Sequence, residues 1–210
     1  MEANLRPLRA DAARNRARVL DAARSAFAEL GLDVGVEEIA RRAGVGKGTL
    51  YRRFPTKDAL VRAIFEDILD DVDARVAEAE RIEDPWESFA RYVESVAELQ
   101  ISNQGFFDVV NQRLGAVVLS PEQRTRALAG TAQLLARAQE AGVVRSDLTP
   151  EDVQIMLRMV GAATRPAIDG TPMDQRWRRY LTLLLDGIRP EAATPLPAES
   201  WTAAPAPDSA

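Results

Sequence analysis

Apolar residues recur along most of the chain at the spacing of an α-helix. In the first strongly periodic stretch, Leu20, Ala23 and Phe27 lie three and four positions apart, so they share one helix face. Gly31 then ends the stretch, as glycine commonly does at a helix C-terminus. The alternation of apolar and polar residues typical of a β-strand does not recur. The pattern predicts an all-α fold.

Turn-forming residues divide the remaining chain into further helices. Two short helices are predicted over 36–43 and 47–54, and Pro55 ends the second. A long helix follows from Thr56, a suitable N-cap, to about Arg81. Another begins near Pro85, and four later segments have the same helical period: 105–118, 120–142, 149–163 and 173–188. The prediction is about nine helices.

This division suggests three parts. Residues 1–56 would form a small helical domain, and residues 57–189 a larger helical bundle. The segment 190–210 is rich in Pro, Ala and Ser and lacks a helical stripe, so we expect a disordered tail.

The segment 36–54 has the spacing of a helix-turn-helix. Ala40 is small where the two helices would approach most closely, and Gly44 follows four residues later, where the turn needs a left-handed backbone. Three apolar residues would fix the angle between the helices: Ile39, Val45 and Leu50. In such a motif the second helix enters the DNA major groove.

The charge is distributed unevenly along the chain. The net charge is −5, but residues 1–60 hold 12 Lys or Arg and 8 Asp or Glu, whereas the other 150 residues hold 15 and 24. A basic N-terminal part on an acidic body is typical of a protein that binds an anion at one end. The two lysines, Lys47 and Lys57, both lie in or beside the predicted motif.

Several kinds of chemistry are excluded by composition. There is no cysteine and no histidine, so a disulfide, a thiolate metal site and a histidine base are absent. We therefore expect no metal, no cofactor and no catalytic residues. The sequence shows no signal core and no run long enough to span a bilayer, which favours a cytoplasmic protein without a membrane partner.

The second helix of the motif carries the residues suited to DNA. Gly46 and Gly48 would let the backbone approach the sugar-phosphate chain, and the hydroxyls of Thr49 and Tyr51 can donate to phosphates. The nearby cations are Lys47, Arg52 and Lys57. Two alternatives compete with this interpretation. A phosphate-binding P-loop needs a different glycine spacing and a preceding strand, and a helix-turn-helix can also serve packing alone.

Residues 22–65 resemble the tetracycline-repressor (TetR) family of bacterial transcriptional regulators. The most specific parts are "IARRAGV", "GTLYRRF" and "KDAL". The resemblance implies a three-helix DNA-binding domain joined by a long fourth helix to a helical regulatory and dimerisation domain. It further implies a homodimer on a palindromic double-stranded DNA operator, released by a small-molecule effector. The family's DNA-contacting positions correspond here to Arg41, Arg42, Lys47, Gly48, Thr49, Tyr51, Arg52 and Lys57.

One departure from the family pattern concerns the starts of the two motif helices. Family members often have Ser or Thr there, with a hydroxyl that also binds phosphate, whereas this chain has Gly35 and Gly46. Glycine caps a helix almost as well. The two glycines are therefore compatible with the fold, but they cannot make the hydroxyl contacts with phosphate.

The sequence of the larger domain gives less information about function than the helix-turn-helix does. The resemblance places the dimer interface on the last two helices, at Val153, Leu157, Val160, Trp177, Leu181 and Leu184, and we favour this over the alternative that these stripes pack inside one subunit. Candidate ligand-binding residues are Trp86, Phe89, Phe106, Phe107, Asn111, Arg113, Met156 and Met159, each of which could instead be ordinary core.

The sequence favours a ligand-responsive DNA-binding repressor rather than an enzyme. An activator would have the same sequence features. The alternative from another class is an all-helical ligand-binding protein or enzyme with a vestigial helix-turn-helix. Its mark would be a buried carboxylate pair, but Asp70, Asp71 and Asp73 fall mostly on the polar side of their predicted helix.

Overall fold

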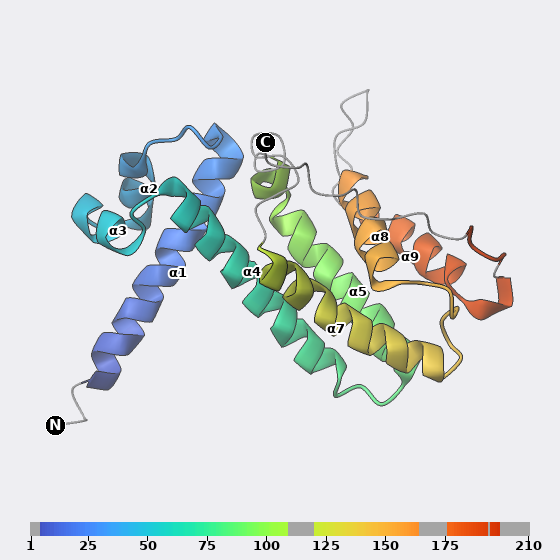
Figure 1. Cartoon of the computed structure of the whole chain (residues 1–210). Coiled ribbons are helices and arrows are strands. Elements are labelled where there is room, and N and C mark those ends of the chain that lie inside the picture. Colours follow the sequence, from blue (N-terminus) through green and yellow to red (C-terminus); the bar gives the residue numbers. More distant parts are fainter. Residues whose placement is uncertain (1–4, 109–119, 164–175, 193, 198–210) are drawn as a thin grey trace, which may run out of the picture.

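The computed structural model describes residues 5–108, 120–163, 176–192 and 194–197 (Figure 1). Within these ranges the chain forms eight α-helices and one short 3-10 helix, and no β-strand. The all-α prediction is confirmed. Of the predicted helix 105–118, residues 105–108 are helical and the remainder lies outside the described residues. None of the helices in the described ranges is both long enough and apolar enough to cross a lipid bilayer.

Three helices form one end of the molecule: α1 (Leu5–Leu30), α2 (Val36–Ala43) and α3 (Lys47–Arg53). Gly31 ends α1 with a φ of 79°, and Gly44 makes the turn between α2 and α3 with a φ of 63°. Both values lie in the left-handed region that residues with a Cβ rarely adopt. The glycines that the sequence singled out as turn residues therefore have the required backbone conformation.

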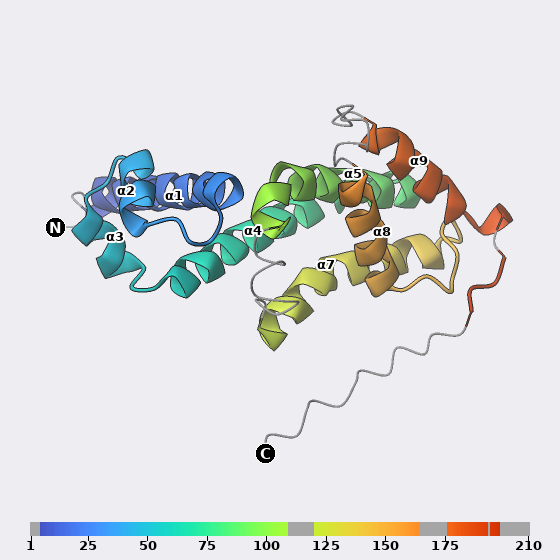
Figure 2. The same cartoon turned by 90° about the horizontal axis from the view of Figure 1, so that it is seen from above.

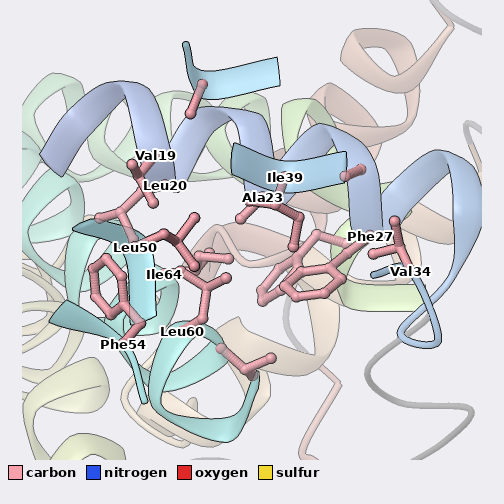
Figure 3. Close-up of a cluster of buried hydrophobic side chains, with 14 of the residues drawn as sticks. Val19, Leu20, Ala23, Phe27, Val34, Ile39, Leu50, Phe54, Leu60 and Ile64 are labelled. Carbon is pink, nitrogen blue, oxygen red and sulfur yellow. The ribbon is translucent and has the colours of Figure 1, made fainter. Parts of the chain in front are cut away.

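A first apolar core, the N-terminal core, holds these helices together (Figure 3). Ile39 of α2 and Leu50 of α3 are buried against Phe27 of α1, and Phe54 closes the core after α3. Val45, in the turn, packs at its edge. The three apolar residues predicted to fix the angle between the motif helices therefore do hold α2 and α3 on a common core.

The long helix α4 (Lys57–Ala79) connects the two parts of the molecule (Figures 1 and 2). The Thr56 hydroxyl caps it by accepting the Ala59 N–H at 3.1 Å, as predicted. Its apolar residues recur every four positions, so the stripe rotates by about 40° at each step around a helix of 3.6 residues per turn. Ile64 therefore lies in the N-terminal core, Val72 packs against both cores, and Val76 packs against the second core.

The second core, the bundle core, lies among α4, α5 (Pro85–Ser102), α7 (Pro121–Glu140), α8 (Pro150–Ala162) and α9 (Trp177–Gly187). Three of these helices begin with proline directly after a capping side chain: Asp84, Ser120 and Thr149. Proline lacks only an N–H that the first turn leaves unpaired in any case. These starts match the sequence prediction because capping is a local interaction.

The residues predicted for the dimer interface lie in this bundle core. Within a single subunit, Val153, Leu157 and Val160 of α8 and Trp177 and Leu181 of α9 are buried, and Leu184 is partly buried. Within one subunit these apolar stripes face α5, α7 and each other, which is the packing that the sequence left open as the alternative. The dimer interface itself stays a prediction.

Within the predicted disordered tail 190–210, the structure describes residues 190–192 and 194–197. Pro190–Ala192 forms a 3-10 helix. Beyond it, the Arg145 guanidinium donates to the Thr194 carbonyl at 2.5 Å, and the Leu196 N–H donates to Asp147 at 3.1 Å. The buried Arg145 provides charge-assisted hydrogen bonds that composition does not reveal.

Candidate nucleic-acid interface

Helix α3 faces outward almost entirely. Of its seven residues only Leu50 is buried, with 2% of its surface exposed, and the other six are exposed to solvent. Leu50 anchors the helix in the N-terminal core, so the remaining side chains project from the tip of the molecule. The exposed set contains five of the predicted DNA contacts: Lys47, Gly48, Thr49, Tyr51 and Arg52.

The two glycines at the start of α3 leave bare backbone on this surface. Gly46 is the N-cap in an extended conformation, with φ −68° and ψ 140°, and no side chain caps the helix. A Cβ built at Gly48 would meet nothing within 4 Å. The fold itself therefore does not require glycine at position 48.

Carboxylates of α2 hold the cations beside this surface. The Lys47 ammonium pairs with Glu37, and it also lies 5.7 Å from the centre of the Tyr51 ring. Glu38 accepts from Arg41 at 2.8 and 2.6 Å and from Arg42 at 2.8 Å. The hydrogen bonds from Arg41 and then Arg42 lower the pKa of Glu38 to about 2. The ion pairs of Glu38 with Arg41 and with Arg42 are therefore both charged at neutral pH.

Arg42 and Lys57 have structural partners in addition. Arg42 also donates to Glu29 of α1 at 2.8 Å, which fastens α2 to α1. The Lys57 ammonium donates to the Leu32 carbonyl at 2.9 Å and joins the start of α4 to the α1–α2 loop. Both predicted DNA contacts therefore already stabilise the three-helix arrangement.

Family models match both parts of the chain. Residues 19–64 match "Bacterial regulatory proteins, tetR family", and residues 84–190, about half of the chain, match "Transcriptional regulator SbtR-like, C-terminal domain". The chain belongs to the TetR family of transcriptional regulators.

Individual relatives agree with this assignment. A TetR transcription regulatory protein from Mycobacterium vanbaalenii is 36% identical, with a TM-score of 0.64 over 87% of this chain and 99% of that one. The TetR regulator SCO0520 from Streptomyces coelicolor is 30% identical, with a TM-score of 0.65 over 83% and 98%. An uncharacterized HTH-type transcriptional regulator of Mycobacterium tuberculosis, Rv2250c, is 31% identical over 133 residues, or 61% of this chain and 69% of that protein.

Among the described residues, the candidate effector residues of this TetR-family regulator lie in separate places. Phe106 and Phe107 lie at the N-terminal core beside Phe65, with ring centres 5.3 to 5.9 Å apart. Phe89 and Met156 are buried in the bundle core. Trp86 stacks under the guanidinium of Arg189, Met159 is exposed, and Asn111 and Arg113 lie outside the described residues.

An open groove of about 410 Å³ lies elsewhere on this TetR-family regulator, between α4 and α5. Its lining is mostly polar and includes Arg75, Tyr92, Ser95 and, from α9, Arg178. None of the described effector candidates lines this groove. Sequence periodicity cannot reveal a groove built from the polar sides of two helices.

Sequence reasoning also overlooked Glu37 and Glu38. The spacing of Glu38 to Arg41 and Arg42, three and four residues, is the spacing of neighbours on a helix and could have indicated that pairing. The pairing of Glu37 with Lys47 joins two helices across the turn. Only the folded angle between α2 and α3 reveals it.

Proposed function

We propose that this protein is a ligand-responsive repressor that binds a palindromic operator as a homodimer and is released by a small molecule. The observation that carries the proposal is the outward face of α3. One buried leucine holds a short helix whose exposed residues include Lys47, Tyr51 and Arg52 at the tip of the molecule. A major groove admits such a helix, and hydroxyl and cationic side chains can reach phosphates and base edges.

The roles proposed for the two parts of the chain correspond to the two cores. Residues 1–56 would bind DNA, and residues 57–189 would bind the effector and the second subunit. Helix α4 contributes to both cores, so a displacement at its bundle end moves residues that support α3. The bundle also contacts α1, because Arg24 donates to Asp67 of α4 at 2.9 Å and to Asn103 at 2.8 Å.

The homodimer is proposed to use the outward sides of α8 and α9. Met159 of α8 is 55% exposed and Leu183 of α9 is 58% exposed, with Tyr180 partly exposed one turn before Leu183. These helices lie side by side at one edge of the bundle (Figures 1 and 2). Pairing these faces in two subunits would bury large apolar side chains that one subunit leaves in water.

The DNA contacts are proposed from position and exposure. Lys47, Thr49, Tyr51 and Arg52 project from α3, and Gly48 leaves its backbone open. Arg41 is the most exposed of the cations on α2, so it can exchange Glu38 for a phosphate. Arg42 and Lys57 would act mainly by holding α1, α2 and α4 in place.

A gel shift on the DNA upstream of this protein's own gene tests the proposal. We expect retarded bands whose affinity falls steeply between about 50 and 200 mM salt, because each phosphate contact releases bound counterions. In the DNA-competent dimer the two α3 helices should lie about 34 Å apart, one turn of the duplex. No shift with any neighbouring promoter at low salt would contradict the proposal.

A further inference from the structure

Two adjacent glutamates neutralise cations on the surface proposed to meet DNA. Glu37 and Glu38 lie in the first turn of α2. Glu38 holds two arginines of its own helix, whereas Glu37 reaches across the turn to Lys47, the first residue of α3. The Glu37 and Lys47 side chains are 60% and 54% exposed, so a phosphate from solvent can reach the pair.

The ion pair between Glu37 and Lys47 would affect non-specific and specific DNA binding to different extents. Non-specific binding depends almost entirely on cations that neutralise phosphates. A lysine that already holds a carboxylate adds no net charge where a phosphate would lie, and the carboxylate repels that phosphate. Base-edge contacts, such as a lysine with guanine O6 and N7, arise only at a matching sequence. The pair therefore weakens non-specific binding more than specific binding.

A purely structural role for Glu37 is the competing explanation. A carboxylate in the first turn of a helix interacts favourably with the helix dipole, whatever its partner. Exposed ion pairs, however, stabilise a fold only weakly. Glu151 provides the comparison, since it is also an exposed glutamate at the second position of a helix, α8.

We propose that Glu37 is a specificity-determining residue, which holds Lys47 away from phosphates on non-operator DNA. This inference rests on the proposed DNA-binding function. In each subunit, Glu37 would compete with the phosphates of the DNA backbone for Lys47. Removing its charge should increase binding to any duplex, and the increase should be larger for non-operator DNA.

The test compares full-length variants by fluorescence anisotropy on two labelled duplexes, one from the upstream region and one of unrelated sequence. Glu37→Gln should raise affinity for unrelated DNA roughly fivefold to tenfold for each subunit engaged at about 0.1 M salt. Its plot of log affinity against log salt should steepen by about 0.9 per engaged subunit. The ratio of operator to unrelated affinity should fall.

Two further variants isolate the cause. In a Lys47→Ala background, Glu37→Gln should no longer raise the affinity, because the competed cation is gone. Glu151→Gln removes the same charge from the same helix position without touching α3, and it should match the wild type. Thermal unfolding confirms that each variant is folded.

Different results overturn different conclusions. If Glu37→Gln binds both duplexes like Glu151→Gln, or if its gain persists without Lys47, the inference is wrong while the proposed function stands. If the wild-type protein binds neither duplex at low salt, the proposed function and the inference fall together.

Discussion

At the scale of single residues, folding and the proposed DNA contact would make opposite demands on Gly48. Glycine inside a helix costs roughly 0.5–1 kcal/mol relative to alanine, and an added Cβ at position 48 meets nothing within 4 Å. Gly48→Ala should therefore raise the free energy of unfolding by up to about 1 kcal/mol. If the backbone of α3 approaches DNA there, the same change should lower operator affinity.

Chemical denaturation and anisotropy titrations on the same protein sample measure both effects. Stabilisation together with weaker binding assigns Gly48 to the DNA surface. Stabilisation with unchanged operator affinity would remove Gly48 from the proposed contacts.

Part of the loss of stability at acid pH should also depend on one residue, Glu38. Hydrogen bonds from Arg41 and Arg42 hold the pKa of Glu38 at about 2, below its usual 4.5. The unfolded chain thus binds this proton more readily, so the stabilisation is complete above about pH 4.5 and is lost as the pH falls towards 2. We expect Glu38→Gln to lower the unfolding midpoint slightly at pH 7. Between pH 4.5 and 2 its midpoint should change less than that of the wild type, and parallel curves would contradict this.

At the scale of helices, the sequence predicted the starts and turns well because they depend on neighbouring residues. Thr56, Ser120 and Thr149 cap helices where the sequence placed them, and Gly44 makes the predicted turn. An apolar stripe, by contrast, indicates that a face is covered but not what covers it. For the stripe containing Leu157 the sequence favoured a partner subunit and left packing inside one subunit as the alternative, and α5, α7 and α9 of the same chain cover it.

The candidate DNA-binding surface was predictable to a similar extent. The exposed positions of α3 followed from the motif, because one buried leucine fixes which side faces solvent. The ion pair of Glu37 with Lys47 and the hydrogen bond from Lys57 to the Leu32 carbonyl did not. Both join residues whose proximity depends on how separate helices pack, which no local spacing encodes.

The contact between α4 and α7 depends on a glycine. A Cβ at Gly130 would lie 2.3 Å from a methyl group of Val76. Forcing extra atoms into such a contact typically costs about 1–3 kcal/mol, so Gly130→Ala should lower the unfolding midpoint by several degrees, at roughly 2–4 °C per kcal/mol. Thermal unfolding followed by circular dichroism measures the change.

A second substitution tests the cause. Val76→Ala removes the methyl group that the new Cβ would meet, so the double variant should be less destabilised than the two single effects added together. Simple additivity would show that the loss arises elsewhere than at this contact.

At the scale of the whole molecule, the residues that the structure describes attach the bundle to the DNA-binding helices at two places. One is the continuous helix α4. The other lies where α1 meets the turn after α5: Arg24 donates to Asn103 at 2.8 Å, and a Cβ at Gly105 would lie 2.7 Å from the Cβ of Ala28. A rearrangement of the bundle would therefore reach α3 through both α1 and α4, because the three helices share one core.

The proposed dimer places the strongest constraint on the whole molecule, because two α3 helices must reach one operator together. Leu183→Arg puts a charge in the centre of the proposed α8–α9 face, where leaving it buried and unpaired costs roughly 3 kcal/mol or more. We expect sedimentation to change from dimer to monomer and operator affinity to fall about 100-fold or more, since the second half-site no longer benefits from linkage. Leu30→Arg is the matched control, because Leu30 is similarly exposed, at 53%, but lies at the end of α1. A Leu183→Arg protein that remains dimeric would rule out this face as the interface and return the question to the other exposed apolar positions.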